Sequence, residues 1–219
     1  MATNLPIIRD VANNAKKFCP DAFTIVISNP LDAMVYEYMK VTGCSKKKIA
    51  GMAGVLDSAR FQLFLAREAN VSIKDVRAMV LGGHGDDMVP VLSMCTINGV
   101  PVTQFIAKDK LASIVERTRK GGGEIVNLMG TSAYYAPASS AVAMAEAYLL
   151  DQKRLLPVAS YLEGEFGYKD LFMGVPAIVG GEGIEKIVEI PLTEEEKGML
   201  AKSAASVQGI VDVVKKTPA

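Results

Sequence analysis

A short run of β-branched residues near the start of the chain sets the class of fold. Phe23–Ser28 reads Phe-Thr-Ile-Val-Ile-Ser between two prolines, which is typical of a buried strand in a parallel sheet. Residues 31–42 return to helical periodicity and stop at Gly43, and residues 46–52 are predicted as a second short strand. Because a strand, a helix and a strand in succession form a parallel unit, the sequence predicts an α/β fold.

The rest of the chain follows the same two periodicities. Apolar residues at helical spacing predict helices over residues 7–18, 55–70, 108–120, 136–150 and from 193 to about 216. Apolar runs predict strands over residues 76–81, 89–96, 100–102, 155–162 and 171–179. Gly121–Gly123 are expected to weaken or bend the third helix, and the weakly polar fourth helix is expected to be buried. Asn98–Gly99 is expected to form a hairpin turn, and residues 127–137 a turn of small residues.

The charge balance argues against a polyanionic partner. Lys and Arg together number 24, as do Asp and Glu, so no net field attracts nucleic acid or an anionic membrane. Cys19, Cys44 and Cys95 are too scattered for a disulfide framework or a zinc site, and they favour a reducing, cytoplasmic compartment. No apolar run reaches the length of a membrane span. We therefore expect neither a nucleic acid nor a membrane as a partner.

The only histidine in the chain lies in a glycine-rich turn that follows an apolar run. After the strand predicted over residues 76–81, Gly82, Gly83 and Gly85 allow a sharp turn that presents the side chain of His84 to a cleft. A neutral imidazole in such a place accepts or delivers a proton near pH 7. A lone histidine is more often structural or at the surface, so the catalytic interpretation depends on a second segment.

Asp57 and Arg60 supply that second segment. They are three residues apart, so on a helix both side chains project from the same face. A carboxylate can fix the tautomer of a histidine and stabilise its charged form. A guanidinium can bind a substrate carboxylate through two parallel hydrogen bonds. Such a pair is usually a solvated ion pair, but here the neighbouring residues are apolar, which argues against an ordinary exposed face.

Three motifs together carry a resemblance to a known family. Ile25–Pro30, Leu56–Phe61 and Gly82–Pro90 resemble, in order and spacing, the motifs of the lactate and malate dehydrogenases. The sequence Gly-Gly-His-Gly-Asp-Asp-Met-Val-Pro looks like the malate branch, in its bacterial, lactate-dehydrogenase-like form. Each motif alone would be moderate evidence, whereas three in register are strong.

The resemblance implies a fold in two parts. Residues 1–53 would be the C-terminal remnant of a doubly wound, Rossmann-type NAD-binding domain, and residues 54–219 the complete α+β catalytic domain. Such a sheet normally carries a Gly-x-Gly-x-x-Gly turn that holds the pyrophosphate. The nearest matches, at Gly83 and Gly181, fail at the third glycine, and Gly121–Gly123 follow no strand. We therefore expect the first four strands, this turn and the mobile active-site loop with its arginines to precede the present sequence.

The resemblance also implies a role for each residue of the site. His84 would be the general base for alcohol oxidation and the acid in reverse, and Asp57 would be its orienting carboxylate. Arg60 would bind the first carboxylate of the substrate. Asn29 directly follows a strand end, where α/β sheets bind ligands, and would contact the nicotinamide ribose and the substrate oxygen.

NAD is the cofactor that the family implies. The backbone of Ile27 and Ser28 would border the same nucleotide, and Asn4 matches a cofactor contact of the family. Thr131–Ser132 either approach the substrate pocket or form a plain turn. Asp86–Asp87 resemble metal ligands, but adjacent acids at a strand end without a partner His or Cys are more often solvated, so no metal is assigned.

The predicted function is an NAD-dependent malate dehydrogenase, which interconverts malate and oxaloacetate, with impaired activity where part of the cofactor site is missing. A lactate or other 2-hydroxy-acid dehydrogenase is an alternative, because malate is favoured over lactate only by the residues beside His84. A second alternative is an inactive fragment that acts only as an oligomerisation module. A homo-oligomer, either a dimer or a tetramer, is expected in each case.

Overall fold

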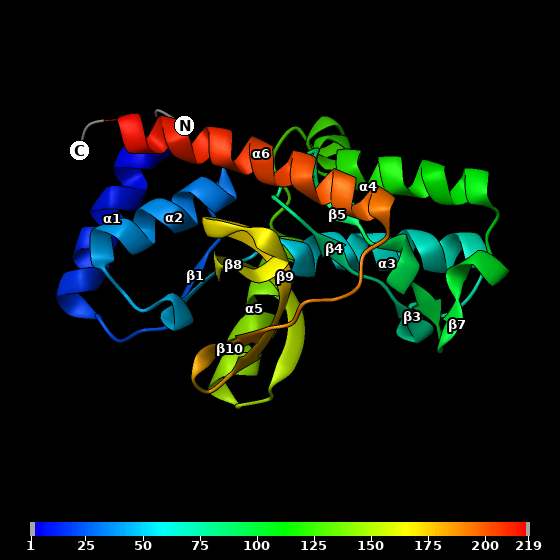
Figure 1. The fold of residues 1–219 in the computed structure, drawn as a ribbon, viewed down its shortest axis with the longest axis horizontal. Coiled ribbons are helices and arrows are strands. Elements are labelled where there is room, and N and C mark those ends of the chain that lie inside the picture. Colours follow the sequence, from blue (N-terminus) through cyan, green and yellow to red (C-terminus); the bar gives the residue numbers. More distant parts are fainter. Residues whose placement is uncertain (1–2, 218–219) are drawn as a thin grey trace.

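A five-stranded sheet lies at the centre of the computed structural model, which describes residues 3–217 (Figure 1). In spatial order its strands are β1 (Thr24–Val26), β2 (Ile49–Gly51), β8 (Arg154–Glu163), β9 (Lys169–Gly180) and β10 (Gly183–Ile187). The pair β1–β2 is parallel, and the three pairs that follow are antiparallel. The predicted α/β fold is therefore confirmed, and the parallel pair β1–β2 shares one mixed sheet with the antiparallel strands β8–β10.

Two helices pack together beside β1 and β2. They are α1 (Asn4–Phe18) and α2 (Leu31–Thr42), and α2 ends where Gly43 adopts a φ of 69°. Arg9 of α1 donates to Glu37 of α2 at 2.5 Å and to the carbonyl of Thr217 at 3.0 Å. The start of α1 and the end of the last helix therefore lie side by side (Figure 1).

The strands predicted around the histidine turn are shorter than expected and belong to two small sheets. The first sheet contains β3 (Val76–Arg77), β6 (Thr96–Ile97) and β7 (Val100–Pro101), and the second β4 (Val80–Leu81) and β5 (Val89–Pro90). The single strands predicted over residues 76–81 and 89–96 were therefore wrong. The amide of Val80 donates to Ser58 Oγ at 2.9 Å, which ties β4 to the helix α3 (Gly54–Ala69) rather than to the sheet of β3. The Asn98–Gly99 hairpin is confirmed, with positive φ at both residues.

Helix α4 (Lys108–Met129) packs against α3 and runs without a break through its three glycines. The predicted weakening at Gly121–Gly123 concerns the stability of this helix, and it stays a prediction. Gly121 is buried at the point where the side chain of Arg60 crosses α4, so its missing Cβ serves a close approach between two helices. The helix ends at Gly130, and residues 127–129 belong to it rather than to the predicted turn.

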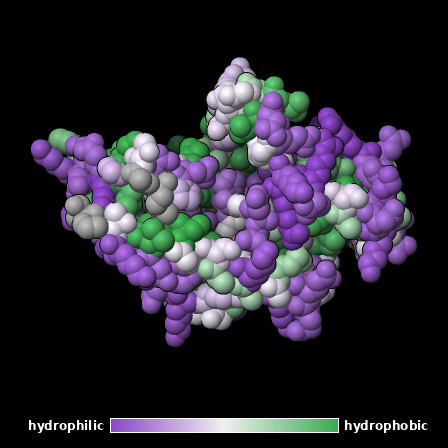
Figure 2. Space-filling view, turned by 90° about the horizontal axis from the view of Figure 1, so that it is seen from above, coloured by the Kyte–Doolittle hydropathy of each residue, from purple (hydrophilic) through white to green (hydrophobic). Residues whose placement is uncertain are grey.

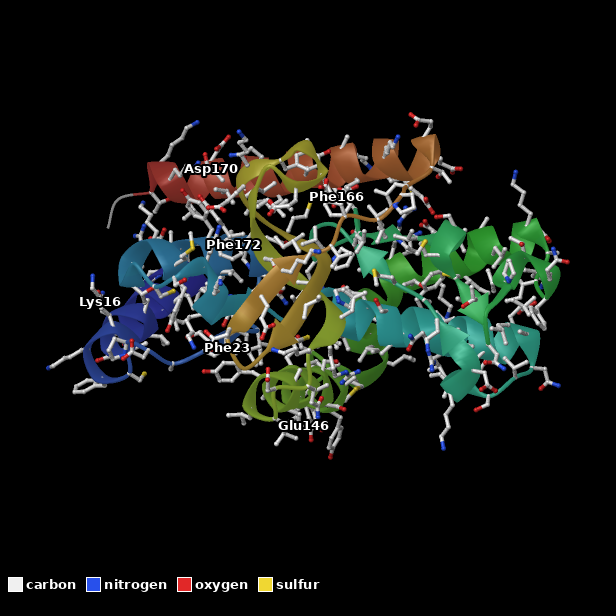
Figure 3. The ribbon with its side chains drawn as sticks, turned by 60° about the horizontal axis from the view of Figure 1, so that its bottom comes forward. Lys16, Phe23, Glu146, Phe166, Asp170 and Phe172 are labelled. Carbon is white, nitrogen blue, oxygen red and sulfur yellow. The ribbon has the colours of Figure 1, made fainter. Side chains whose placement is uncertain are left out.

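Helix α5 (Tyr135–Leu149) packs against β9, on the side of the sheet opposite α6 (Glu194–Lys216) (Figure 1). Phe23, before β1, stacks on Tyr148 of this helix with ring centroids 4.6 Å apart (Figure 3). The prediction that α5 is buried was wrong for most of its surface. Val142 is 55% exposed and Leu149 is 74% exposed, because the sheet covers only one face of a helix that is apolar all round.

Helix α6 begins with the predicted capping box, in which Thr193 and Glu196 bind each other's backbone amides. Its apolar face is buried against β9 and α2, and the helix runs along the upper side of the molecule (Figure 1). The face seen from that side is mostly hydrophilic, with hydrophobic residues in separate patches (Figure 2). Among the described helices, none is both long and apolar enough to cross a membrane.

Strand β10 was not predicted, since Gly181 and Gly183 were considered only as a failed nucleotide-binding turn. A Cβ on Gly183 would lie 1.9 Å from the carbonyl oxygen of Lys47, and the φ of this glycine is 90°. The glycine therefore serves a tight turn into an edge strand that passes close to another backbone.

Candidate active site

The turn that carries His84 is fixed to the central sheet by its first glycine. Gly82 and Gly174 of β9 exchange two backbone hydrogen bonds, of 2.8 and 3.0 Å. A Cβ on Gly174 would lie 2.6 Å from the carbonyl oxygen of Gly82, whose own φ is 85°. Glycine at both positions therefore lets β4 end against the sheet and turn sharply.

The next two amides of the turn are held by side chains from two helices. The amide of Gly83 donates to Ser203 Oγ of α6 at 2.9 Å. The amide of His84 donates to Asp32 Oδ2 of α2 at 3.0 Å. The turn is thus anchored from three directions, and the backbone of His84 has a defined position.

The side chain of His84 meets the predicted carboxylate. Its Nδ1 lies 2.7 Å from Asp57 Oδ2, and the other carboxylate oxygen of Asp57 accepts from Arg60 Nη1 at 3.3 Å. Asp57 is 1% exposed. With the carboxylate as acceptor, Nδ1 carries the proton, and Nε2 is left as the ring atom that can exchange a proton with a substrate.

The surroundings of His84 favour its protonated form. Burial opposes the charged imidazolium, but the hydrogen bond that the ring donates to Asp57 and the negative charge of Asp57 outweigh burial, and Asp32 adds to them. The pKa of His84 is therefore raised, although the positive charge of Arg60 acts in the opposite direction. A raised pKa suits a group that delivers a proton near neutral pH.

A pocket of ≈ 420 Å³ brings together four of the predicted residues, Asn29, Asp57, Arg60 and His84. The rest of its wall comes from Pro30, from residues 85, 86 and 88 of the histidine turn, and from residues 119, 122 and 123 of α4. Its size is typical of small-molecule sites.

Arg119 and Asp32 were missed by the sequence interpretation. Arg119 Nε donates to the carbonyl of Met88 at 3.2 Å, and its Nη2 lies 3.0 Å from Met199 Sδ. The sequence gives no signal for this residue, since its partners lie far along the chain. Asp32 stands three residues after Asn29 in the first turn of α2, and that acidic position was the available signal.

The predicted cofactor residues gather at the carboxyl end of β1. Asn4 Nδ2 donates to the carbonyl of Asn29 at 2.6 Å, which connects the start of α1 to the pocket. Ile27 and Ser28 follow β1 and are exposed, although neither lines the pocket itself. An exposed apolar residue beside an amide side chain fits the nicotinamide and ribose half of NAD. The sequence offers no glycine-rich turn for the pyrophosphate half.

Two other predicted positions are not part of this arrangement. Thr131–Ser132 lie in the exposed connection between α4 and α5 and do not line the pocket. Asp87 of the histidine turn is paired with Lys202 and Ser206 of α6, at 2.7 Å each. Among residues 3–217, no group of three or more His, Cys, Asp or Glu side chains has the geometry of a metal site.

Comparison with known proteins gives matches along almost the entire chain. Residues 1–51 match the NAD binding domain, and residues 54–217 the alpha/beta C-terminal domain, of lactate/malate dehydrogenases. The chain is 77% identical over 215 residues to a malate dehydrogenase of Sorangium cellulosum, covering 98% of this chain and 69% of that protein. It is 56% identical to malate dehydrogenase 1 of Anaeromyxobacter dehalogenans, covering 95% of this chain and 67% of that protein.

Solved structures agree with these matches. A malate dehydrogenase of Cryptosporidium parvum superposes with a TM-score of 0.96 at 46% identity, over 98% of this chain and 70% of that one. A lactate dehydrogenase from the same organism, complexed with lactic acid and NAD, gives a TM-score of 0.96 at 43% identity, over 99% of this chain and 70% of that one. The chain described here belongs to the lactate/malate dehydrogenase family.

Proposed function

We propose that the chain is the catalytic part of an NAD-dependent malate dehydrogenase, with residues 54–219 as the substrate-binding unit and residues 1–53 as part of the cofactor-binding unit. The observation that carries the proposal is the hydrogen bond of 2.7 Å between His84 and Asp57 in a pocket that Arg60 also lines. A proton acceptor, a carboxylate that stabilises its charged form and a carboxylate-binding guanidinium are what oxidation of a 2-hydroxy acid requires.

In the oxidation of malate, His84 Nε2 takes the proton of the substrate hydroxyl group. Asp57 stabilises the imidazolium that results, through the hydrogen bond to Nδ1. Arg60 holds the carboxylate next to the reacting carbon, so that the hydroxyl group faces the imidazole. Asn29 and the backbone of Ile27 and Ser28 would hold the nicotinamide end of NAD, which would supply the hydride acceptor for that carbon. Asn29, in the segment between β1 and α2, orients the substrate oxygen, and His84 returns its proton in the reverse reaction.

Malate is favoured over lactate by a second positive side chain. Arg119 lines the same pocket as Arg60, and its side chain is three-quarters buried. Two guanidinium groups in one pocket suit a substrate with two carboxylates, whereas lactate has one. Relatives at 77% and 56% identity are named malate dehydrogenases, which supports the same choice. A lactate dehydrogenase remains the alternative, because one of the structural neighbours was solved with lactic acid.

The residues that fit NAD lie at the nicotinamide end, and we expect the 219-residue chain by itself to turn over slowly. Loss of one preorganised electrostatic contact typically costs about 10²–10³ in rate. The test is NADH oxidation with oxaloacetate and, separately, with pyruvate. Each substrate is assayed with the purified chain and with an added fragment of the Sorangium cellulosum relative that carries the part of that protein outside the matched region.

The expected result is a rate near background for the chain alone, restored activity with the fragment, and preference for oxaloacetate. Preference for pyruvate would favour the lactate alternative. No NADH oxidation in the mixture, with both pieces folded and associated, would refute the dehydrogenase proposal.

The exposed apolar face of α5 supports a second role in self-association. We propose that the protein forms a homo-oligomer through this face. Should the chain lack activity, this self-association would be its only function. The three cysteines are free, which fits the proposed reducing, cytoplasmic location.

A further inference from the structure

Behind His84 lies a second buried carboxylate that the proposed reaction does not use. Asp32 is 6% exposed, and its Oδ2 accepts from the amide of His84 at 3.0 Å. Its Oδ1 is buried and makes no hydrogen bond to any described residue. Burial raises the pKa of Asp32 to about 6, against the opposing effects of the His84 amide and of the imidazolium charge.

A buried carboxylate that holds a single amide carries a large desolvation cost, because burying a charge with only one partner is unfavourable. The neighbouring amide shows that a neutral group is sufficient. Gly83 donates to Ser203 Oγ at 2.9 Å, slightly shorter than the bond from His84 to Asp32. The negative charge of Asp32 is therefore not needed to anchor the turn. The role of that charge is its electrostatic effect on the imidazole ring of His84.

We propose that Asp32 is a positioning residue for the reaction, which fixes the backbone of His84 and whose negative charge stabilises the imidazolium form of that residue. The proposal rests on the proposed function, in which His84 is the proton carrier. Asp57 binds the ring at Nδ1, whereas Asp32 acts from the opposite end of the residue, through the backbone amide. Asp32 also stands on the segment that carries Asn29, so the same helix start positions both the substrate oxygen and the proton carrier.

Each element around the pair contributes its own charges. Asp57 and Arg60 face His84 from α3, and Arg119 lines the same pocket from α4. Asp86 lies on the histidine turn itself and lines the pocket too. Around Gly83, α6 presents Ser203 and Val207, which carry no charge, and its Lys202 forms an ion pair with Asp87 of the histidine turn. Asp57 is the stronger influence on His84, and Asp32 acts in the same direction.

The test uses the fact that His84 is the only histidine of the chain, so that its ring proton signals in NMR are assigned without ambiguity. The pKa of His84 is measured by titrating the full 219-residue chain and its Asp32→Asn variant. Asparagine keeps an oxygen that can accept from the His84 amide and removes the charge. We expect a measurably lower midpoint in Asp32→Asn, and in the wild type a curve broader than that of a single site, because two interacting groups titrate together.

Two control variants separate charge from anchoring. Ser203→Ala removes the neutral anchor of the neighbouring amide, and Asp87→Asn removes a carboxylate of the same turn that is bound to α6. Both are expected to leave the midpoint of His84 where it is in the wild type. An unchanged midpoint in Asp32→Asn, or an equal fall in Ser203→Ala, would overturn the proposal.

The NMR readout does not depend on turnover, so failure of the dehydrogenase assay and failure of this inference are distinguishable. Should Asp32→Asn not fold, Asp32→Ser supplies a neutral acceptor of the kind that already holds Gly83. The titration curve of the wild type tests the coupling between Asp32 and His84 without any variant, since a single-site curve would count against that coupling. In the active mixture of chain and fragment, the pH at which oxaloacetate reduction falls should move down in Asp32→Asn.

Discussion

At His84, three charged side chains determine what one imidazole ring can do. Asp57 fixes the proton on Nδ1 and favours the charged ring, while Arg60 shares that carboxylate and opposes the charge. Asp32 adds a second negative charge without touching the ring. The residue therefore has the raised affinity for a proton that suits general acid–base chemistry near neutral pH.

Replacement of Asp32 by asparagine should change how stability depends on pH. Burial raises the pKa of Asp32 from 3.8 to about 6, so the folded chain binds this proton more tightly than the unfolded chain. The stability that the proton provides is complete below the unfolded-state pKa and is lost as the pH rises through the folded-state value. Between about pH 4 and pH 8, we expect the wild type to lose on the order of 2–3 kcal/mol relative to Asp32→Asn. Urea unfolding at each pH measures this difference, and parallel losses in both proteins would contradict it.

The sequence predicted the residues whose chemistry is visible in a short motif. Asp57 and Arg60 are related by helical spacing, and glycines mark the turn around His84, so their meeting in one pocket was expected. Asp32 and Arg119 act on that turn from 52 and 31 residues away, and no local pattern relates them to it. Only the packing of α2 and α4 against the turn shows what these residues do.

Among the helices, α4 has a glycine, Gly121, that leaves space for the side chain of Arg60. A Cβ on Gly121 would lie 2.4 Å from Arg60 Cδ and 2.7 Å from its Nε. Because these atoms belong to a flexible side chain, Gly121→Ala should displace Arg60 rather than unfold the helix, and alanine gains up to about 1 kcal/mol of helix propensity. We expect the Kd for oxaloacetate, measured by calorimetry, to rise by roughly tenfold or more, with little change in Tm.

Gly209→Ala in α6 is the matched control for this prediction. A Cβ there would meet nothing within 4 Å, and the position is far from the pocket in the sequence and in its contacts. It should gain helix propensity without any effect on oxaloacetate binding. Equal affinities in Gly121→Ala and Gly209→Ala would show that Arg60 does not need this space.

The long elements were predictable, whereas the division of the chain into short strands around the histidine turn was not. Residues 155–162 and 171–179 were expected as strands and form β8 and β9, since long apolar runs leave little choice. The run over residues 76–81 looks continuous, yet it divides between two sheets because Val80 is bound to Ser58 of α3. A strand of two residues is defined by its partners, and those partners lie elsewhere in the sequence.

At the scale of the whole molecule, the central sheet has one helix on each side, and the two helices differ in which of their faces are buried. Helix α6 buries one apolar face and carries charged residues on the other, as expected for a surface helix. Helix α5 has apolar residues all round but buries only three residues, of which Met144 and Ala147 are apolar and Ser140 is polar. Its outer face, with Val142 and Leu149 exposed, therefore resembles an interior surface rather than a solvated one.

This outer face should hold copies of the chain together, and Leu149→Glu tests it. Leu149 is 74% exposed, so a glutamate there costs the single chain little, whereas in a symmetric interface it removes apolar contact twice and brings charge into it. Since burying a leucine contributes about 1.5–3 kcal/mol, the dissociation constant should rise by at least about tenfold. Light scattering across a concentration series measures it. Val213→Glu, at a position 52% exposed on α6, is the control and should leave the mass unchanged. A monomeric wild type would refute the proposed oligomer, and an oligomer that only Val213→Glu dissociates would place the interface on α6.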